Sequence, residues 1–392
     1  MKRLFKTSSI AIILILFALF AKAEIEIEGR DPLRLVENLE MELGLNTGYT
    51  GNLLNDVTKT DDRNITPSMA LRYFPVSFLG ISYESEYTYY SDTYRLSNYY
   101  GRLGISLIPT KAESAFTFYF NGSFDFRKYH QSTRSFDNDN IDLIASFGFR
   151  AADQLHFRLG YTFNANTYIH ASHSDLIKYE TFAGGNWTMF GSNTIDLEIG
   201  YSITAYSAVI DTFMPPVIDT IYSGLKADDY FSDTYLLAFY VSPRFSRSLG
   251  SKTGMSLEFN YQKFSNEDES VIIISEFEHI SPFAGVTEGR SITLNLKTFL
   301  IKNAIVNTGA GYWYKSYLRM FDGPYESTRI YLTEKRVDEL SRWYVSLELP
   351  VPVGRTDLLK STWTLDYYNN VSNFNQFDYH KWTFSTGLIF QF

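Results

Sequence analysis

The sequence predicts an all-β protein, a transmembrane antiparallel up-and-down β-barrel of about sixteen strands. Three observations predict it: a signal-like N-terminus, long stretches in which apolar and polar residues alternate, and connections that alternate between short and long. The composition agrees, because 17% of the 392 residues are aromatic, including 30 Tyr and 32 Phe. Tyr and Phe favour strands, and aromatic side chains gather where a protein meets lipid and its interfaces.

The N-terminus has the three parts of a secretory signal. Basic residues at positions 2, 3 and 6 precede an apolar run from Ile10 to Ala21, and Ala21-Lys22-Ala23 supplies small residues for cleavage. A retained helical anchor is the alternative, but the run is shorter than the about 20 residues that cross a bilayer. We therefore expect a signal peptide at 1–23, a short periplasmic N-terminal segment at 24–38 and an outer-membrane barrel at 39–392.

Alternation with a period of two is the main strand signal. From Ile195, the odd positions are apolar as far as Ile203, while the even positions carry Asp196, Glu198 and Gly200. Each such segment reaches the 9–11 residues that a tilted strand needs to cross the hydrocarbon, so each is expected to span it. The segments lie near 38–50, 65–74, 79–90, 95–108, 115–130, 140–150, 155–169, 177–189, 194–208, 233–244, 254–264, 290–301, 304–319, 339–349, 358–371 and 379–392.

Charged residues are nearly absent from the apolar side of these segments. A Lys or Arg at mid-bilayer on the lipid side destabilises a barrel by about 2–4 kcal/mol, and the effect fades toward the interfaces. The exceptions are expected near strand ends: Arg95, Lys128, His130, Lys263, Arg290 and Glu339. This depth dependence is typical of a strand face that contacts lipid.

The connections are short and long in turn, as in outer-membrane barrels with short periplasmic turns and longer external loops. The link near 91–94 is the exception, because it is short where a long one is expected. Either it is a tight hairpin or the barrel has fourteen strands. Soluble β-sandwiches and β-propellers are alternatives. A β-sandwich would not be expected to carry aromatic residues so densely along sixteen strands. A β-propeller would show a sequence repeat of about 40–45 residues, and this sequence has none.

Composition excludes several function classes. A net charge of −9 disfavours a nucleic-acid surface, and the absence of cysteine excludes disulfides, thiol catalysis and thiolate metal sites. The pair His170 and His173 lacks the acidic partner of a metal site, so no metal and no cofactor is expected. His, Ser and Asp also lie near one another at 130–137 and 170–175, but six histidines in polar loops make this unsurprising, and no catalytic residue is assigned.

The C-terminus resembles the last strand of bacterial outer-membrane β-barrel proteins of the porin-like kind. Its alternate positions carry Phe384, Thr386, Leu388, Phe390 and Phe392, ending on an aromatic residue. The resemblance implies that Phe384, Leu388, Phe390 and Phe392 form the signal read by the barrel-insertion machinery. No porin subfamily is indicated: the link at 131–139 lacks the acidic, Gly-containing constriction motif of general diffusion porins, and no plug domain fits before Leu39.

If the apolar side faces lipid, the opposite side lines the interior, where acids and bases are nearly balanced. So many charges in a dry interior would be strongly unfavourable, which favours a wet lumen, and sixteen strands is the size at which porins leave an aqueous channel. The candidate pore-lining residues are Glu84, Arg102, Asp125, Arg127, Arg150, Arg158, Glu180, Glu198, Glu258 and Lys297.

The expected external loops are rich in Asp and Glu, for example at 61–62, 137–139, 228–229 and 267–269. A negative mouth concentrates cations, so weak cation preference is one hypothesis and plain solubilisation is the other. Within 265–289, the apolar run Val271–Ile274 either folds inward as a constriction or extends a hairpin above the membrane.

Three functions remain open. The first is a porin-like channel for passive diffusion of small hydrophilic solutes. The second is a structural or surface-interaction barrel with ligand-binding loops, and the third is an outer-membrane barrel hydrolase. The partners expected are outer-membrane lipid, signal peptidase and the insertion machinery during biogenesis, and small solutes, with no nucleic acid. The oligomeric state is not indicated.

Overall fold

The computed structural model describes residues 38–51, 61–108, 114–169, 176–189, 192–206, 234–265, 287–300, 303–317, 336–353, 356–373 and 375–391. Within them, sixteen strands form one closed barrel in which each strand pairs antiparallel with the next. Sixteen strands are therefore confirmed and the alternative of fourteen is wrong. Among these residues, no helix is long and apolar enough to cross a membrane.

The strand bounds follow the predicted segments closely and differ mainly by a few residues at the ends. The strands are β1 Leu39–Thr50, β2 Asp62–Val76, β3 Leu79–Tyr90, β4 Asn98–Leu107, β5 Phe116–Tyr129, β6 Asn138–Ala152, β7 Leu155–Tyr168, β8 Leu176–Met189, β9 Asn193–Tyr206, β10 Thr234–Ser248, β11 Thr253–Phe264, β12 Thr287–Phe299, β13 Ile305–Tyr317, β14 Val337–Val353, β15 Thr356–Ser372 and β16 Tyr379–Gln391.

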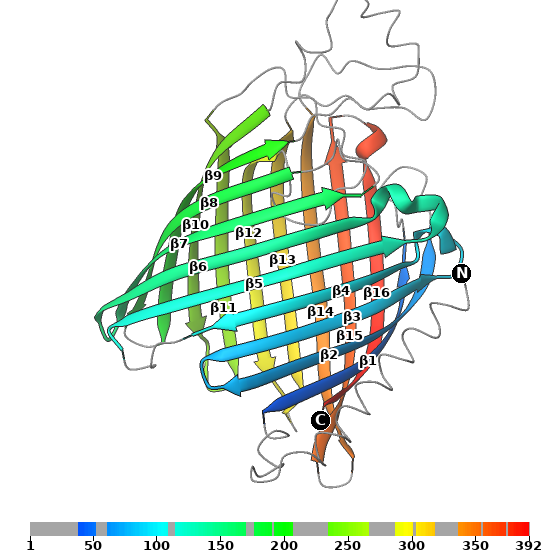
Figure 1. Ribbon diagram of the computed structural model, residues 1–392, viewed down its shortest axis with the longest axis horizontal. Coiled ribbons are helices and arrows are strands. Elements are labelled where there is room, and N and C mark those ends of the chain that lie inside the picture. The colour runs from blue at the N-terminus through cyan, green and yellow to red at the C-terminus, as the bar shows by residue number, and fades with distance from the viewer. Residues whose placement is uncertain are drawn as a thin grey trace, which may run out of the picture.

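Closure joins the two ends of the sheet. β1 pairs with β16 from Glu42↔Gln391 to Thr50↔Thr383, so no strand is left with an unpaired edge. An open edge in hydrocarbon would leave backbone N–H and C=O groups without partners, at several kcal/mol each. The strands of the near wall cross those of the far wall at a large angle (Figure 1), as expected when tilted strands close a barrel.

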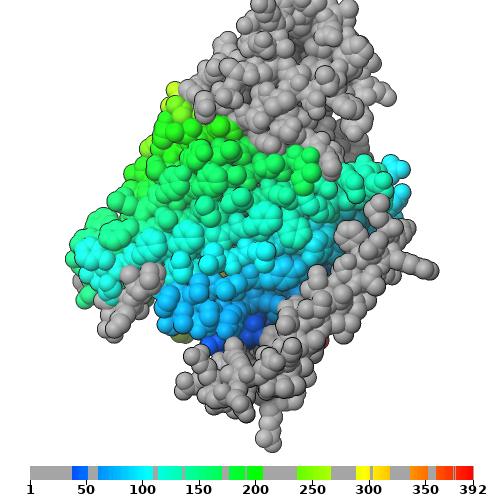
Figure 2. All heavy atoms as spheres, viewed as in Figure 1, coloured from blue at the N-terminus to red at the C-terminus, as the bar shows by residue number. Residues whose placement is uncertain are grey.

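The outer face of the barrel is apolar. Large side chains such as Leu45, Leu103 and Leu159 are 53%, 51% and 62% exposed there, and they belong to the side predicted to meet lipid. On the flank seen in Figure 2, β2 to β9 present one continuous outer surface. A soluble protein rarely exposes an apolar surface of this size, whereas hydrocarbon covers it at no penalty.

The links at the two ends of the barrel differ in length. At one end they are mostly short (77–78, 108–115, 153–154, 190–192, 249–252, 300–304 and 354–355), and the longest links, 207–233, 265–286 and 318–336, are at the other end. By the general rule for such barrels, the short turns mark the periplasmic end. The few charged residues predicted on the lipid-facing side of the strands, including Lys128, Arg290 and Glu339, all lie toward the opposite, external end.

The link between β3 and β4 runs over residues 91–97, longer than the tight hairpin expected at 91–94, and contains a single 3-10 turn, η1 Tyr94–Leu96. Asp62, at the external tip of β2, holds it. Its carboxylate accepts hydrogen bonds from the backbone N–H groups of Ser91, Asp92 and Thr93 at 3.1, 3.0 and 2.7 Å, and from the Ser91 and Thr93 hydroxyls. Burial alone raises the pKa of Asp62, but these hydrogen bonds outweigh it and hold that pKa well below its usual range.

We expect Asp62→Ala to lower the free energy of unfolding by about 1–3 kcal/mol, because the N–H and hydroxyl donors of this link lose the buried carboxylate that accepts from them. Since the folded pKa is depressed, this stabilisation is full above the unfolded Asp pKa of about 4 and disappears as the pH falls through the folded value. Denaturant titrations at pH 7 and at decreasing pH measure both. Asp92→Asn, an exposed neighbour in the same link, is the control and should change little. Equal effects of the two substitutions would contradict the role of Asp62.

Candidate functional site

The inner wall of the barrel brings together residues that are distant in sequence. Because the strands pair in register, side chains on the inner side form rows around the barrel. One row joins Thr117, Gly148, Arg158, Gly184 and Glu198 through successive strand pairs. The row below it, nearer the periplasmic end, joins Arg150, His156, Asn186, Asp196, Arg244 and Glu258.

Acids and bases on neighbouring strands of this wall form ion pairs. Arg102 Nε lies 3.0 Å from Asp125, and Arg158 lies 2.7 Å from Glu198 and 3.5 Å from Asp196. These groups are not sealed from water: the side chains of Arg102 and Arg158 are 38% and 46% exposed. Further pairs on the wall are Arg72 with Glu40 and Glu42, Arg102 with Asp142, Lys178 with Glu180, Arg342 with Asp366, and Lys360 with Glu348.

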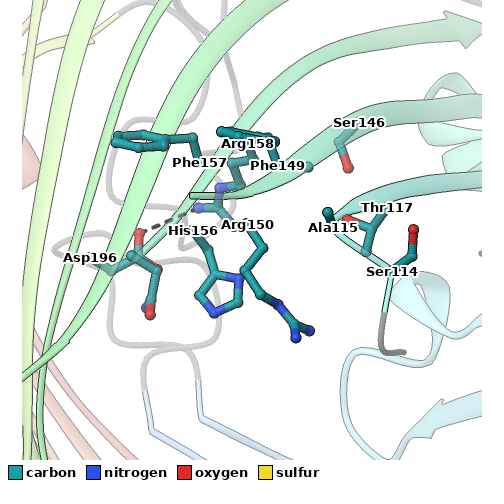
Figure 3. Close-up of a pocket in the computed structure, with 12 residues that line it drawn as sticks. Ser114, Ala115, Thr117, Ser146, Phe149, Arg150, His156, Phe157, Arg158 and Asp196 are labelled. Atoms are coloured by element: carbon teal, nitrogen blue, oxygen red, sulfur yellow. Dashed lines mark hydrogen bonds and ion pairs between the residues drawn. The ribbon is translucent and has the colours of Figure 1, made fainter. Parts of the chain in front are cut away.

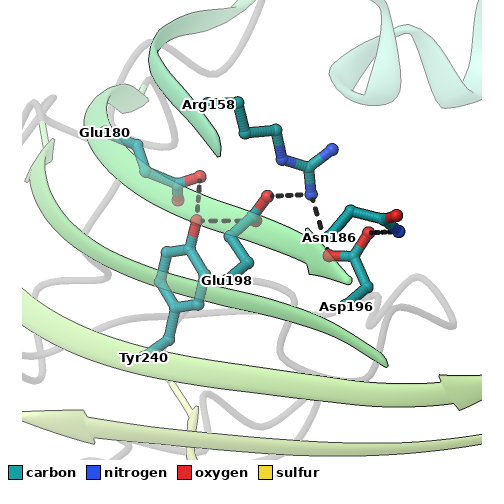
Figure 4. Close-up of polar contacts among 6 residues, drawn as sticks. All are labelled: Arg158, Glu180, Asn186, Asp196, Glu198 and Tyr240. Atoms are coloured by element: carbon teal, nitrogen blue, oxygen red, sulfur yellow. Dashed lines mark hydrogen bonds and ion pairs between the residues drawn. The ribbon is translucent and has the colours of Figure 1, made fainter. Parts of the chain in front are cut away.

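A tyrosine connects two of the predicted acids. The Tyr240 hydroxyl lies 3.2 Å from Glu180 Oε1 and 3.0 Å from Glu198 Oε1, and Arg158 completes the group on the far side of Glu198 (Figure 4). The ring of Tyr240 lies over Gly200, where an added Cβ would come within 2.2 Å of it. The glycine therefore makes room for the tyrosine that bridges the carboxylates.

The remaining predicted residues take other partners. Glu84 faces Arg102 in the β3–β4 register and, with Glu42, Glu86 and Arg72, lines a hollow of about 280 Å³. Arg127 lies over the Tyr100 ring at 5.3 Å, Lys297 over the Phe299 ring at 5.4 Å, and Glu258 accepts a hydrogen bond from Asn260 at 2.9 Å.

Arg150 belongs to a second hollow on the inner wall, near the periplasmic end of β5 to β9. This hollow has a volume of about 350 Å³. Figure 3 shows Arg150 and His156 together with the hydroxyl side chains of Ser114, Thr117 and Ser146, while Arg158 turns toward Asp196. The hollow is therefore rich in hydrogen-bond donors.

The external end of the inner wall is packed instead. Trp313, Leu340 and Tyr368 form a buried apolar cluster against Tyr379. Beside it, Arg336 is clamped between the rings of Tyr317 and Phe377, with its guanidinium carbon 4.2 and 3.6 Å from the ring centroids. Arg336 also makes a bidentate pair with Asp338, which accepts a further hydrogen bond from Asn370 at 3.2 Å. This region of β13 to β16 is thus packed and partly closed to water.

The acids predicted for the external loops have mostly structural contacts. Asp62 and Asp139 lie in strands β2 and β6 rather than in loops, so their placement in loops was wrong. Asp62 caps the β3–β4 link, Asp137 accepts a hydrogen bond from Tyr129 N–H at 2.7 Å, and Asp139 pairs with Lys128 at 3.0 Å. Each of these charges is thus partly neutralised or buried.

Some residues of the wall were not predicted. Arg244 was missed because β10 was expected to end there, whereas it continues to Ser248. Tyr240 and Thr117 are uncharged, so the pattern of acids and bases does not indicate them. The same two-residue period that placed the acids would have placed both on the inner side.

Several expectations lie outside the described residues. These are the signal peptide, the segment 24–37, the His170 and His173 pair, the acids at 228–229 and 267–269, the run Val271–Ile274 and Phe392. In the part of the chain that is described, no three His, Cys, Asp or Glu residues gather as metal ligands would. There, His130 Nδ1 lies 3.1 Å from Ser132 Oγ.

A closed sheet that is apolar outside and charged inside is stable in a bilayer, because its backbone groups are paired and its outer face contacts lipid. In water the same outer face would be an exposed apolar surface. The protein is a transmembrane β-barrel. No family model matches this barrel, and no curated protein matches it. Solved structures share its architecture at low identity. CdiB from Acinetobacter baumannii has a TM-score of 0.51 and 8% identity, covering 90% of this chain and 60% of CdiB.

Two barrels from Pseudomonas aeruginosa are similar over their whole lengths. The outer membrane protein opdK has a TM-score of 0.48 and 10% identity, with 91% of this chain and 99% of opdK covered. OccK8 (OprE) has a TM-score of 0.45 and 8% identity, with 91% and 98% covered. At these identities the likeness concerns the fold, and the function is argued from the barrel's own inner wall.

Proposed function

We propose that this outer-membrane barrel is a porin-like channel for passive diffusion of small hydrophilic solutes. The observation that carries the proposal is the inner wall, where ion pairs such as Arg158–Glu198 and Arg72–Glu40 remain partly exposed inside a sixteen-strand barrel. Ion pairs in a dry core carry a desolvation penalty of several kcal/mol per ion, and contact with water removes most of it. Barrels of this strand number are wide enough to hold water.

The ten predicted residues are proposed to line the path of the solute, from Glu84 on β3 to Lys297 on β12. Five of them, Arg102, Asp125, Arg158, Glu180 and Glu198, form ion pairs with a neighbour, which weakens the net field along this part of the path. We propose a weak cation preference at most, since Asp62, Asp137 and Asp139 near the external end are already engaged by the protein.

The test is conductance in planar bilayers. We expect stable single-channel steps and, in a salt gradient, a reversal potential near zero or slightly on the cation side. A reversal potential that favours anions would contradict the cation preference. Silence from well-folded protein would contradict the channel itself.

A second candidate is a structural or surface-interaction barrel. It is favoured by the packed external end, where Trp313, Leu340 and Tyr368 are buried and Arg336 is clamped. Such a mouth could be too narrow to conduct, and the bilayer recording separates the two candidates. The C-terminal residues Phe384, Leu388 and Phe390, which are exposed on the outer face of β16, are proposed to serve with Phe392 as the insertion signal.

A further inference from the structure

The hollow at the periplasmic end forms where small residues just before β5 and on β6 lie beside Arg158 on β7, whose side chain points away from them. Ala115, Ser146 and Gly148 leave space on the β5–β6 side. Arg158, in the same row as Gly148, is drawn in the opposite direction by Glu198 at 2.7 Å and Asp196 at 3.5 Å. A side chain at position 148 would close this space, since its Cβ would lie 2.3 Å from Thr117 Oγ1.

The groups around this space are mainly donors. Arg150 and His156 are direct partners in the β6–β7 register. The Ser114 hydroxyl accepts a hydrogen bond from Phe116 N–H at 3.2 Å, which leaves its own proton to be donated. Thr117 and Ser146 add two further hydroxyls, and a guanidinium has five N–H donors, enough for a protein partner and a ligand together.

The carboxylate of Asp196, which lines the hollow, already has partners in the protein. Asp196 accepts from Arg158 at 3.5 Å and from Asn186 at 3.3 Å, so it is turned toward β8 and β7 rather than toward the open space. The volume of about 350 Å³ lies at the lower end of the range of ligand pockets and fits a molecule of monosaccharide size.

We propose that this hollow binds a small hydroxylated anion, with Arg150 holding its carboxylate or phosphate and the hydroxyls of Ser114, Thr117 and Ser146 contacting its hydroxyl groups. Charge-assisted hydrogen bonds to a guanidinium are about twice as strong as neutral ones, and the hydroxyl groups add direction. This site rests on the proposed channel, because the anion reaches the hollow through the lumen.

Isothermal titration of the folded barrel in detergent with glucuronate, glucose 6-phosphate and glucose tests the site. We expect one or both anions to bind and glucose not to bind measurably. Glucuronate alone would identify a carboxylate site, and glucose 6-phosphate alone a phosphate site. Arg150→Gln should weaken anion binding about tenfold or more, and Thr117→Val a few-fold. The proposal is overturned if neither anion binds or if glucose binds equally well.

Arg342→Gln is the matched control, because Arg342 is also on the inner wall but pairs with Asp366 outside the hollow. It should leave binding unchanged, and equal losses in both Gln variants would overturn the site. Arg150→Lys keeps the charge and should retain most of the binding, which guards against a variant that merely misfolds. Conductance without binding refutes the hollow alone, whereas binding without conductance refutes the channel alone.

Discussion

Leu159→Lys should lower the free energy of unfolding by about 2–4 kcal/mol, because it places an ammonium group in hydrocarbon. Leu159 is 62% exposed on the outer side of β7, and its neighbours in the register, Ala183 and Phe147, are also outward. Denaturant titration of the barrel in phosphatidylcholine vesicles measures the change.

Thr162→Lys, three residues along the same strand, is the control for this substitution. Thr162 lies on the inner side and pairs in register with Glu180, so a lysine there lies beside a carboxylate instead of in hydrocarbon. We expect a change of less than about 1 kcal/mol, as for most exposed ion pairs. Equal destabilisation by the two lysines would show that the outer side does not face lipid. It would contradict the assignment of the apolar side of each strand to lipid and of the other side to the lumen.

Gly289→Ala should prevent normal pairing of β12 with β13 and lower the free energy of unfolding by about 4 kcal/mol or more. A Cβ at Gly289 would lie 1.9 Å from the backbone oxygen of Tyr314, and its φ of +156° is one that L side chains rarely adopt. Because the obstacle is backbone within a paired strand, no side-chain rotation relieves it.

Gly254→Ala on the neighbouring strand β11 is the matched control. The nearest atom to a Cβ there is Arg247 O at 4.0 Å, so the methyl group fits without displacement. The folded fraction, read as the heat-modifiable band on cold gels, should fall for Gly289→Ala and stay unchanged for Gly254→Ala. A fully folded Gly289→Ala barrel would contradict the close approach of β12 and β13.

The predicted strands were accurate in their centres and less so at their ends. β2 was expected at 65–74 and extends from Asp62 to Val76, and β10 continues four residues past its expected end. At these ends the outer side no longer meets hydrocarbon, so polar residues appear on both sides and the alternation fades. The irregular pairings of β2–β3, β6–β7 and β14–β15 fall beside the short turns at the periplasmic end.

The closed pairing of the structure decided the strand count, sixteen rather than fourteen. The sequence by itself determined that the chain is a barrel of many strands and which side of each strand is apolar. These properties depend on the local two-residue period, which lipid on one side and water on the other impose on every strand separately. Only the tertiary structure decided that Tyr240 joins Glu180 to Glu198, that Arg158 leans away from Gly148, and that Arg150 therefore borders a hollow. Such contacts depend on the register between strands, and that register is fixed only when the whole sheet closes.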